Sequence, residues 1–346
     1  MAKPRENRQL SAGDSTIPAV HALHLADVVE RFGVPRADFF ADAGIAEEEL
    51  LVPDRKLSVA MLEKLVVRAR TMTGEPGLGF HLGTTMRIAG HGYLGFAAMT
   101  SATVREALAT VVRFAPTRTD ALAFHVHTEG SMASVVVEER ASLGEAREVV
   151  VLALVTGIGR LGNLLTGREL TGVIELAFPE PDYVRRFEHM STGPMRFAQP
   201  SNRLLFDASV LDLPITTHDP VAQKLAYEQC ERELDVASQS TRIVARVREL
   251  LPDEHGGFRS LDDVARKLGV SSRTLKRKLA ELGTSYSSLL EAQRRERATM
   301  LVRAGDLTVD QIAGRLGYSD AANFIRAFRR WTGMTPKAFR VAKSDR

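Results

Sequence analysis

Two stretches near the C-terminus, LDDVARKLGVSSRTLKRKLAEL at residues 261–282 and VDQIAGRLGYSDAANFIRAFRRW at residues 309–331, repeat one pattern. The copies are offset by 48 to 49 residues because the second contains one extra residue. The first matches are Ala265 with Ala313, Leu268 with Leu316, Gly269 with Gly317, and Ser271 with Ser319. A small alanine lets a second helix cross closely, glycine supplies a positive φ at a helix end, and serine caps the helix that follows. The repeat therefore predicts two helix-turn-helix units.

The second helix of each unit is predicted to have one buried face and one basic face. Apolar residues recur at helical spacing in both copies. They are Leu275, Leu279 and Leu282 in the first copy and Phe324, Phe328 and Trp331 in the second. The opposite face holds Arg273, Arg277 and Ala280, flanked by Lys276, in the first copy and Ala322, Arg326 and Arg329, with Asn323 and Arg330 on its edges, in the second.

These basic faces fit a helix that lies in a DNA major groove. Arginine pairs bidentately with guanine, asparagine pairs with adenine, and a small side chain permits close approach. Some of the cations are expected to touch phosphate, which positions the protein without reading the sequence. The alternative is a helical bundle whose exposed arginines and lysines have no partner.

A helix is predicted between the two units, at residues 286–303, after the turn residues Gly283-Thr284-Ser285. Eighteen residues at about 1.5 Å each span roughly 27 Å. Such a helix would hold two recognition helices about one DNA turn apart. Its arginines, Arg294, Arg295 and Arg297, are candidates for backbone contact, although a pair of Glu291 with Arg295 is the simpler explanation of part of the cluster.

Charge is divided unevenly along the 346 residues. Residues 241–346 contain 22 Lys and Arg against 12 Asp and Glu, a net charge of +10. Residues 1–240 contain 24 against 31, a net charge of −7. A basic domain attracts phosphates, whereas an acidic one is repelled by DNA. The basic end is therefore predicted to bind DNA; on charge alone, a solvated positive face is the alternative.

The residues before the basic end show mixed helical and strand patterns. The expected helices are 20–32, 36–43, 58–72, 104–114, 145–165 and, short, 183–189. The expected strands are a hairpin within 121–139, then 172–178 and 203–206. The fold class is therefore an α+β N-terminal domain followed by an all-α C-terminal domain with two helix-turn-helix units joined by a linker helix.

Composition gives the domain boundaries. Residues 1–16 are charged and lack an apolar stretch, so they are predicted to be a disordered tail rather than a signal peptide. Residues 17–234 form the N-terminal domain, the small polar segment 235–241 is the linker, and residues 242–346 are the DNA-binding domain.

Another helix is predicted to begin with Pro220 at its first position. Tyr227, Cys230, Leu234 and Ala237 follow at spacings of three, four and three residues. This stripe fits a helix packed on its own domain as well as the seam of a homodimer, because little more than one heptad is visible.

Neither a membrane span nor a disulfide is expected. The longest apolar run, Val149–Gly159, falls well short of the roughly 18 residues that a membrane helix needs. The single cysteine, Cys230, excludes an internal disulfide and a zinc finger and agrees with a reducing compartment. The protein is therefore expected in the cytoplasm.

The stretch IAGRLGYSDAANFIRAFRRWTGMTPKAFR, residues 312–340, resembles the AraC/XylS family of bacterial transcription regulators. The matching positions are Ala313, Gly317, Tyr318, Phe324, Arg326, Phe328, Gly333, Pro336, Phe339 and Arg340. The resemblance implies two helix-turn-helix units in successive major grooves. The DNA contacts that it implies fall on Arg273, Lys276, Arg277, Ala322, Asn323 and Arg326.

The N-terminal part is similar to the arabinose-binding-type sensory domain of such regulators. The fragments that carry this resemblance are GEPGLG at residues 74–79, GHGYLGF at 90–96 and MTSATV at 99–104. The resemblance covers about residues 17–210 and implies effector binding or dimerisation. It does not imply arabinose as the effector, and no ligand-binding residue transfers by motif.

Several histidines are candidate ligands. His125 and His127 alternate on one strand, a spacing compatible with a metal, but no third ligand accompanies them, so a half-exposed strand face is favoured. His21 and His24 share a helix face and are expected to be surface or core residues. His91, between two glycines, is expected to lie in a pocket or a turn.

The predicted function is a sequence-specific DNA-binding transcription regulator that responds to an effector. Its expected partners are double-stranded promoter DNA, a small-molecule effector, a second copy in a homodimer and, if it activates transcription, RNA polymerase. The alternatives are a ligand-independent dimeric regulator and an enzyme fused to a DNA-binding module. No pattern of catalytic residues supports the enzyme, and neither a cofactor nor a metal is expected.

Overall fold

The computed structural model describes residues 15–52, 55–253, 257–282 and 284–341. The chain divides between Asp235 and Val236 into two compact parts, the N-terminal unit and the C-terminal unit. Residues 1–14 of the predicted tail lie outside the described residues. The prediction was wrong for its last two residues, because Ser15 is buried and Thr16 begins strand β1.

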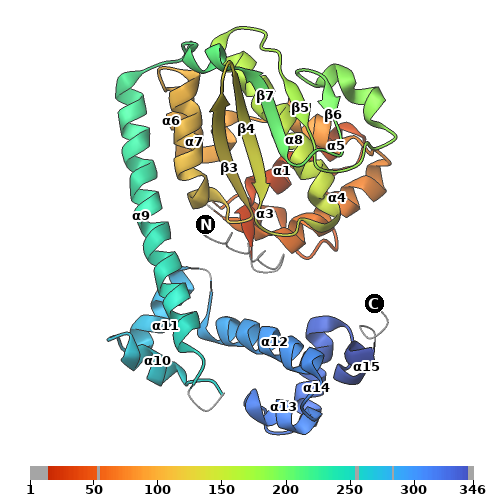
Figure 1. Ribbon diagram of the computed structural model, residues 1–346, viewed down its shortest axis with the longest axis vertical. Coiled ribbons are helices and arrows are strands. Elements are labelled where there is room, and N and C mark those ends of the chain that lie inside the picture. Colours follow the sequence, from red (N-terminus) through yellow and green to blue (C-terminus); the bar gives the residue numbers. More distant parts are fainter. Residues whose placement is uncertain (1–14, 53–54, 254–256, 283, 342–346) are drawn as a thin grey trace. The chain divides into compact units, whose positions relative to one another are not determined.

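The N-terminal unit is an α+β domain, as predicted (Figure 1). Its helices are α1 (Val20–Arg31), α2 (Arg36–Phe40), α3 (Glu47–Leu50), α4 (Val59–Thr73), α5 (Leu78–Thr84), α6 (Gly92–Met99), α7 (Val104–Arg118) and α8 (Arg147–Thr166). Its strands are β1 (Thr16–Pro18), β2 (Lys56–Ser58), β3 (Leu122–Glu129), β4 (Met132–Glu139), β5 (Val173–Glu175), β6 (Met195–Arg196) and β7 (Asn202–Asp207). Short 3-10 helices are η1 (Ile88–His91), η2 (Gly144–Ala146), η3 (Val184–Met190) and η4 (Ala208–Asp212).

The five-stranded sheet has the order β3-β4-β7-β5-β6, and β1 pairs with β2 separately. The predicted hairpin is confirmed: β3 and β4 are antiparallel, with Val126 opposite Val135, and Gly130 turns the chain at φ +58°. Strand β5 is shorter than the predicted 172–178, and the predicted helix at 183–189 is the 3-10 helix η3. Strand β6, which pairs parallel to β5, was not predicted.

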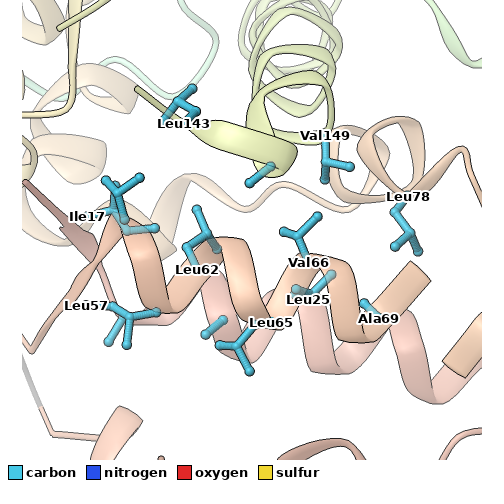
Figure 2. Close-up of a cluster of buried hydrophobic side chains, with 14 of the residues drawn as sticks. Ile17, Leu25, Leu57, Leu62, Leu65, Val66, Ala69, Leu78, Leu143 and Val149 are labelled. Carbon is cyan, nitrogen blue, oxygen red and sulfur yellow. The ribbon is translucent and has the colours of Figure 1, made fainter. Parts of the chain in front are cut away.

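Helix α8 lies between two hydrophobic cores. Val149 belongs to a core with α1 and α4, whereas Leu152 and Val155 belong to a second core with sheet residues. Figure 2 shows Leu62 and Val66 of α4 directed toward Leu143 and Val149. The helix therefore buries apolar side chains in both cores, although Leu164 near its end is exposed.

Within the described residues, one stretch, Gly144–Thr166, has the length and mean hydropathy of a membrane span. It is longer than the apolar run recognised in the sequence. Half of it is buried by the rest of the N-terminal unit, which is the position of a core helix in a globular domain.

Helix α9 (Pro220–Leu250) begins at Pro220, as predicted, and its backbone stays helical through the predicted linker, residues 235–241. Cys230 is buried in a cluster with Leu94 and Phe114, and Leu234 packs on the same cluster. The ring of Tyr227 meets that of Phe114 edge-on at 4.9 Å. The stripe therefore packs on its own domain at these positions.

The C-terminal unit is all helical, as predicted, and it contains two small cores. Its helices are α10 (Leu261–Lys267), α11 (Ser272–Glu281), α12 (Tyr286–Ala304), α13 (Val309–Arg315), α14 (Ala321–Thr332) and α15 (Pro336–Val341). Helix α12 is the predicted linker helix. Leu289 near its start is buried in the core of the first helix-turn-helix unit, and Ala298 and Val302 are buried in the core of the second.

The contact between α5 and α8 depends on glycine. A Cβ atom on Gly79 would lie 2.8 Å from Leu152 Cβ and 2.9 Å from the Val149 carbonyl oxygen. We expect Gly79→Ala to destabilise the protein by about 1–3 kcal/mol, because overpacking forces the two helices apart. Urea unfolding followed by circular dichroism measures this.

The matched control is Gly314→Ala, in α13, where a Cβ atom would meet nothing within 4 Å. This change is expected to stabilise by about 0.5–1 kcal/mol through helix propensity. A Gly79→Ala protein as stable as the wild type would contradict the close packing.

Candidate nucleic-acid interface and ligand cavity

The first helix-turn-helix unit is built as its sequence predicts. Ala265 of α10 is buried where α11 crosses, and Gly269 has φ +69°. The Ser271 hydroxyl accepts a hydrogen bond from the Thr274 backbone N–H at 3.1 Å and so caps α11. These contacts fix the turn between the two helices.

The second unit has the same design with a shifted cap. Ala313 is buried and Gly317 has φ +74°, as predicted. The cap of α14, however, is Asp320, whose carboxylate accepts from the Asn323 N–H at 2.7 Å. The prediction of Ser319 was therefore wrong, because the extra residue of this copy lies before the cap and moves the start of α14 by one position.

The predicted basic faces lie on the surface of both recognition helices, α11 and α14. Leu275, Leu279, Phe324 and Phe328 are buried, as predicted, whereas Leu282 and Trp331, which were also predicted to be buried, are only half-buried. The exposed side chains of the two faces are Arg273, Lys276, Arg277 and Ala280 on α11 and Ala322, Arg326, Arg329 and Arg330 on α14. Each recognition helix therefore presents several cations and a small alanine to its surroundings, which a groove-binding helix requires.

Asn323 differs from the others because it is half-buried and already hydrogen-bonded. Its side-chain amide donates to Ser319 Oγ at 2.9 Å and to Asp320 Oδ2 at 2.7 Å. Its amide oxygen accepts from Arg326 at 2.5 Å. A contact of Asn323 with adenine therefore requires the exchange of these bonds for bonds to the base.

Polar contacts tie the linker helix to the second recognition helix. Glu291 of α12 accepts hydrogen bonds from the Arg330 guanidinium at 2.5 Å and from Trp331 Nε1 at 2.9 Å. The Trp331 and Arg330 donors hold the pKa of the Glu291 carboxyl below its usual value. The pairing of Glu291 with Arg295 that the sequence predicts is compatible with these contacts, because the Arg295 charge also lowers the pKa of Glu291.

Arg294 acts at the same junction. Its guanidinium lies 5.8 Å from the ring centre of Phe258 and 5.2 Å from that of Tyr318. Phe258 contacts both cores of the C-terminal unit. Arg294 was predicted as a candidate for contact with the DNA backbone. In the structure it links the two helix-turn-helix units.

The N-terminal unit contains a cavity of about 300 Å³. Its wall is mostly aliphatic and comes from α1, α4, α7, α8 and the sheet, with residues such as Leu62, Leu108, Val135, Leu154 and Ile158. Within the described residues, its lining includes one cation, Arg118, and no carboxylate.

Three histidines and Arg118 form one polar region of this lining. The His21 ring lies 6.1 Å from that of His24 and 5.5 Å from that of His91. The glycines that flank His91 serve two needs: a Cβ atom on Gly90 would lie 2.8 Å from the His24 ring, and Gly92 has φ +61°, a conformation that favours glycine. The sequence GHG is therefore a turn on which these side chains pack.

These histidines are neutral at physiological pH. Burial, with smaller effects of His91, His24 and Arg118, lowers the pKa of His21 to about 3. Burial and the Arg118 charge lower the pKa of His91 to about 4, and burial also lowers the pKa of His24. The region therefore offers neutral imidazoles beside one guanidinium.

Comparison with known proteins decides the family. Residues 33–215, more than half of the chain, match the arabinose-binding domain of AraC transcription regulators, N-terminal, and residues 264–342 match a helix-turn-helix domain. The chain belongs to the AraC family of transcription regulators. It is thus a DNA-binding transcription regulator, as predicted.

Several transcription regulators match this AraC-family chain over nearly its whole length. The ornithine utilization regulator of Pseudomonas aeruginosa is 31% identical over 327 residues, covering 94% of this chain and 96% of the relative. An uncharacterised HTH-type transcriptional regulator of Mycobacterium bovis is 29% identical over 327 residues, covering 91% and 93%. Among solved structures, the transcriptional regulator CdpR of P. aeruginosa matches at 24% identity with a TM-score of 0.42, over 92% of this chain and 98% of that one.

The other histidine pair of this AraC-family chain lies on the edge strand β3. The rings of His125 and His127 stack at 6.2 Å, and His125 Nε2 lies 2.7 Å from Glu138 Oε2. Within the part of the chain that the structure describes, no three His, Cys, Asp or Glu side chains are placed to hold a metal ion.

The cavity is not evident from the sequence. His21, His24 and His91 stand out there only as separate residues, and nothing singles out Arg118. The available signals were the three-residue spacing of His21 and His24 on one helix and the glycines around His91. Neither signal shows that α1, η1 and α7 meet.

The lowered pKa values of His21 and His91 predict acid sensitivity of the N-terminal unit. An unfolded His21 binds a proton near pH 6.5, whereas the folded state resists protonation down to about pH 3. Stability is therefore lost as the pH falls below 6.5. Between pH 7 and pH 5, His21→Gln is expected to lose about 2 kcal/mol less unfolding free energy than the wild type, measured by urea unfolding.

His189→Gln, at an exposed position of the same unit, is the control. It is expected to keep the wild-type response to acid. An identical response in the His21→Gln protein would show that this imidazole titrates alike in the folded and unfolded states.

Proposed function

We propose that this AraC-family regulator inserts α11 and α14 into successive major grooves of promoter DNA and that a small molecule in the N-terminal cavity controls this binding. The proposal for DNA binding is supported by one observation: α12 belongs to both cores of the C-terminal unit. This helix therefore holds both recognition helices on one rigid element. Its 19 residues span about 28 Å, close to one turn of DNA.

We assign base and phosphate contacts to the exposed basic faces. Arg273 and Arg277 on α11 and Arg326 on α14 are proposed to reach guanine edges, with Ala322 allowing close approach. Lys276 and Arg329 are proposed to contact the backbone. Asn323 is proposed to contact a base once its present intramolecular hydrogen bonds are exchanged for bonds to that base. The regulator acts on promoter DNA in the cytoplasm.

A footprint tests the two-groove arrangement. Two protected patches about one helical turn apart on one face of the duplex are expected. Arg326→Ala should lower affinity for the operator about tenfold or more and should relax specificity in one patch alone. The measurement is quantitative footprinting with wild-type and variant operators.

Arg246→Ala is the control for this experiment. Arg246 lies on α9, outside the recognition helices, and pairs with Glu249 at 2.7 Å. Its loss is expected to leave the footprint unchanged. A single short protected patch, or an Arg326→Ala protein with unchanged binding, would be incompatible with the two-groove arrangement.

The effector part is supported by the cavity in the N-terminal unit. A mostly apolar cavity with a few convergent polar groups is the usual form of a small-molecule site. Native mass spectrometry of freshly purified protein, followed by DNA titration with and without the released molecule, tests it. A protein that carries no small molecule and whose DNA affinity no metabolite changes would instead be a ligand-independent regulator.

A further inference from the structure

Polar contacts from α12 hold the second recognition helix, α14, at both of its ends. At the last turn of α14, Glu291 Oε1 accepts hydrogen bonds from Arg330 at 2.5 Å and from Trp331 Nε1 at 2.9 Å. In the turn just before α14, the Tyr318 ring centre lies 5.2 Å from the Arg294 guanidinium. Glu291 and Arg294 are three positions apart on α12, so they lie on the same face of that helix.

These contacts add a directional constraint that the apolar core lacks. Hydrophobic attraction in the core of the second unit is non-directional, whereas a hydrogen bond requires near-linear alignment. Helix α14 has 12 residues and is about 18 Å long, so a tilt of about 10° would move one end by about 3 Å. Such a displacement would break a bidentate contact between an arginine and a base. The orientation of α14 on α12 therefore decides whether its side chains meet the bases.

Glu291 also determines where the Arg330 guanidinium lies. Arg330 is exposed, on the edge of the predicted basic face. An exposed ion pair is weak by itself, but Trp331, which packs against the core of the second unit, donates to the same Glu291 oxygen and keeps it in place. A phosphate would have to displace this held carboxylate to bind Arg330.

We propose that Glu291 is a positioning residue for DNA recognition. Together with Arg294 it sets the orientation of α14, and it keeps the Arg330 guanidinium on α12 and away from DNA. This inference rests on the proposed insertion of α14 into a major groove.

Glu291→Leu tests the positioning role on the full-length protein. The probe is a DNA duplex that the wild-type protein selects from a random-sequence library, and footprinting with Arg326→Ala identifies the patch that α14 binds. Affinity is measured for this duplex and for two versions, each altered in one patch. Glu291→Leu is expected to lower affinity for the selected duplex about tenfold and to lose discrimination in the α14 patch, because a tilted helix misaligns Arg326. Discrimination in the other patch should stay at the wild-type level.

Glu296→Leu is the matched control, because Glu296 is another exposed glutamate of α12. The same loss of charge there is expected to leave discrimination in both patches unchanged. Equal effects of the two substitutions, equal losses in both patches, or wild-type binding by the Glu291→Leu protein would overturn the positioning role.

The single tryptophan of the chain, Trp331, reports whether the second unit of each variant is folded. Its fluorescence is followed during urea unfolding. If Glu291→Leu fails to fold, Glu291→Gln carries the test, because its amide oxygen still accepts from Trp331 while the charge that holds Arg330 is lost. An affinity loss of about threefold, confined to the α14 patch, is then expected. A loss spread over both patches, or none, would again overturn the role.

Salt dependence tests the withdrawal of Arg330 from DNA. Each phosphate contact adds about 0.9 to the slope of log affinity against log salt concentration. Arg329→Gln, which removes a proposed backbone contact, is expected to lower this slope by about 0.9, whereas Arg330→Gln should change it by less than about 0.3. A decrease for Arg330→Gln as large as that for Arg329→Gln would show that Arg330 binds a phosphate and would overturn its assignment.

Failure of this inference is separable from failure of the proposed function. A single protected patch with the wild-type protein would refute insertion into two grooves. Two patches with the wild type, of which neither depends on Glu291, would refute the positioning role and leave the two-groove arrangement standing.

Discussion

One helix belongs to two hydrophobic cores, and the geometry of the C-terminal unit depends on this sharing. Leu289 of α12 is buried with the first helix-turn-helix unit and Val302 with the second. Because an α-helix has a fixed rise per residue, the number of residues between these positions sets the distance between the cores. Glu291 and Arg294 add polar and cation–π contacts at the second unit. Because the two recognition helices are already held at a fixed distance, DNA binding does not have to order them. The binding free energy is therefore not reduced by that entropic cost.

Helix α8 plays a comparable part in the N-terminal unit. Its close contact with α5 at Gly79 leaves no room for a side chain there, whereas its face toward α7 and the sheet borders a cavity. Tight packing and an internal space therefore lie on different sides of one helix. The cavity is aliphatic apart from one region, where burial keeps the imidazoles of His21 and His91 neutral beside Arg118.

Membership of the AraC family fixes the class of protein but not the effector. A fold hosts many ligands because specificity resides in the side chains that line the site. Here the described lining of the cavity is mostly aliphatic and includes one cationic side chain, although the matching family domain is named after a sugar, arabinose. The charge distribution agrees with this separation of functions. The basic C-terminal residues attract DNA phosphates, and the acidic N-terminal residues repel them.

The sequence by itself determined which side chains of the recognition helices are buried and which are exposed. The period of 3.6 residues decides this within a window of a dozen residues, so Leu275, Phe324 and Arg326 lie where the spacing predicts. Ser319 and Asp320 are both capping residues, and only the folded turn shows that Asp320 begins α14. Tertiary structure alone decided that Glu291 pairs with Arg330, 39 residues away, and that His21, His91 and Arg118 meet at one cavity. Periodicity is a local property, whereas these contacts exist only once packing has brought distant helices together.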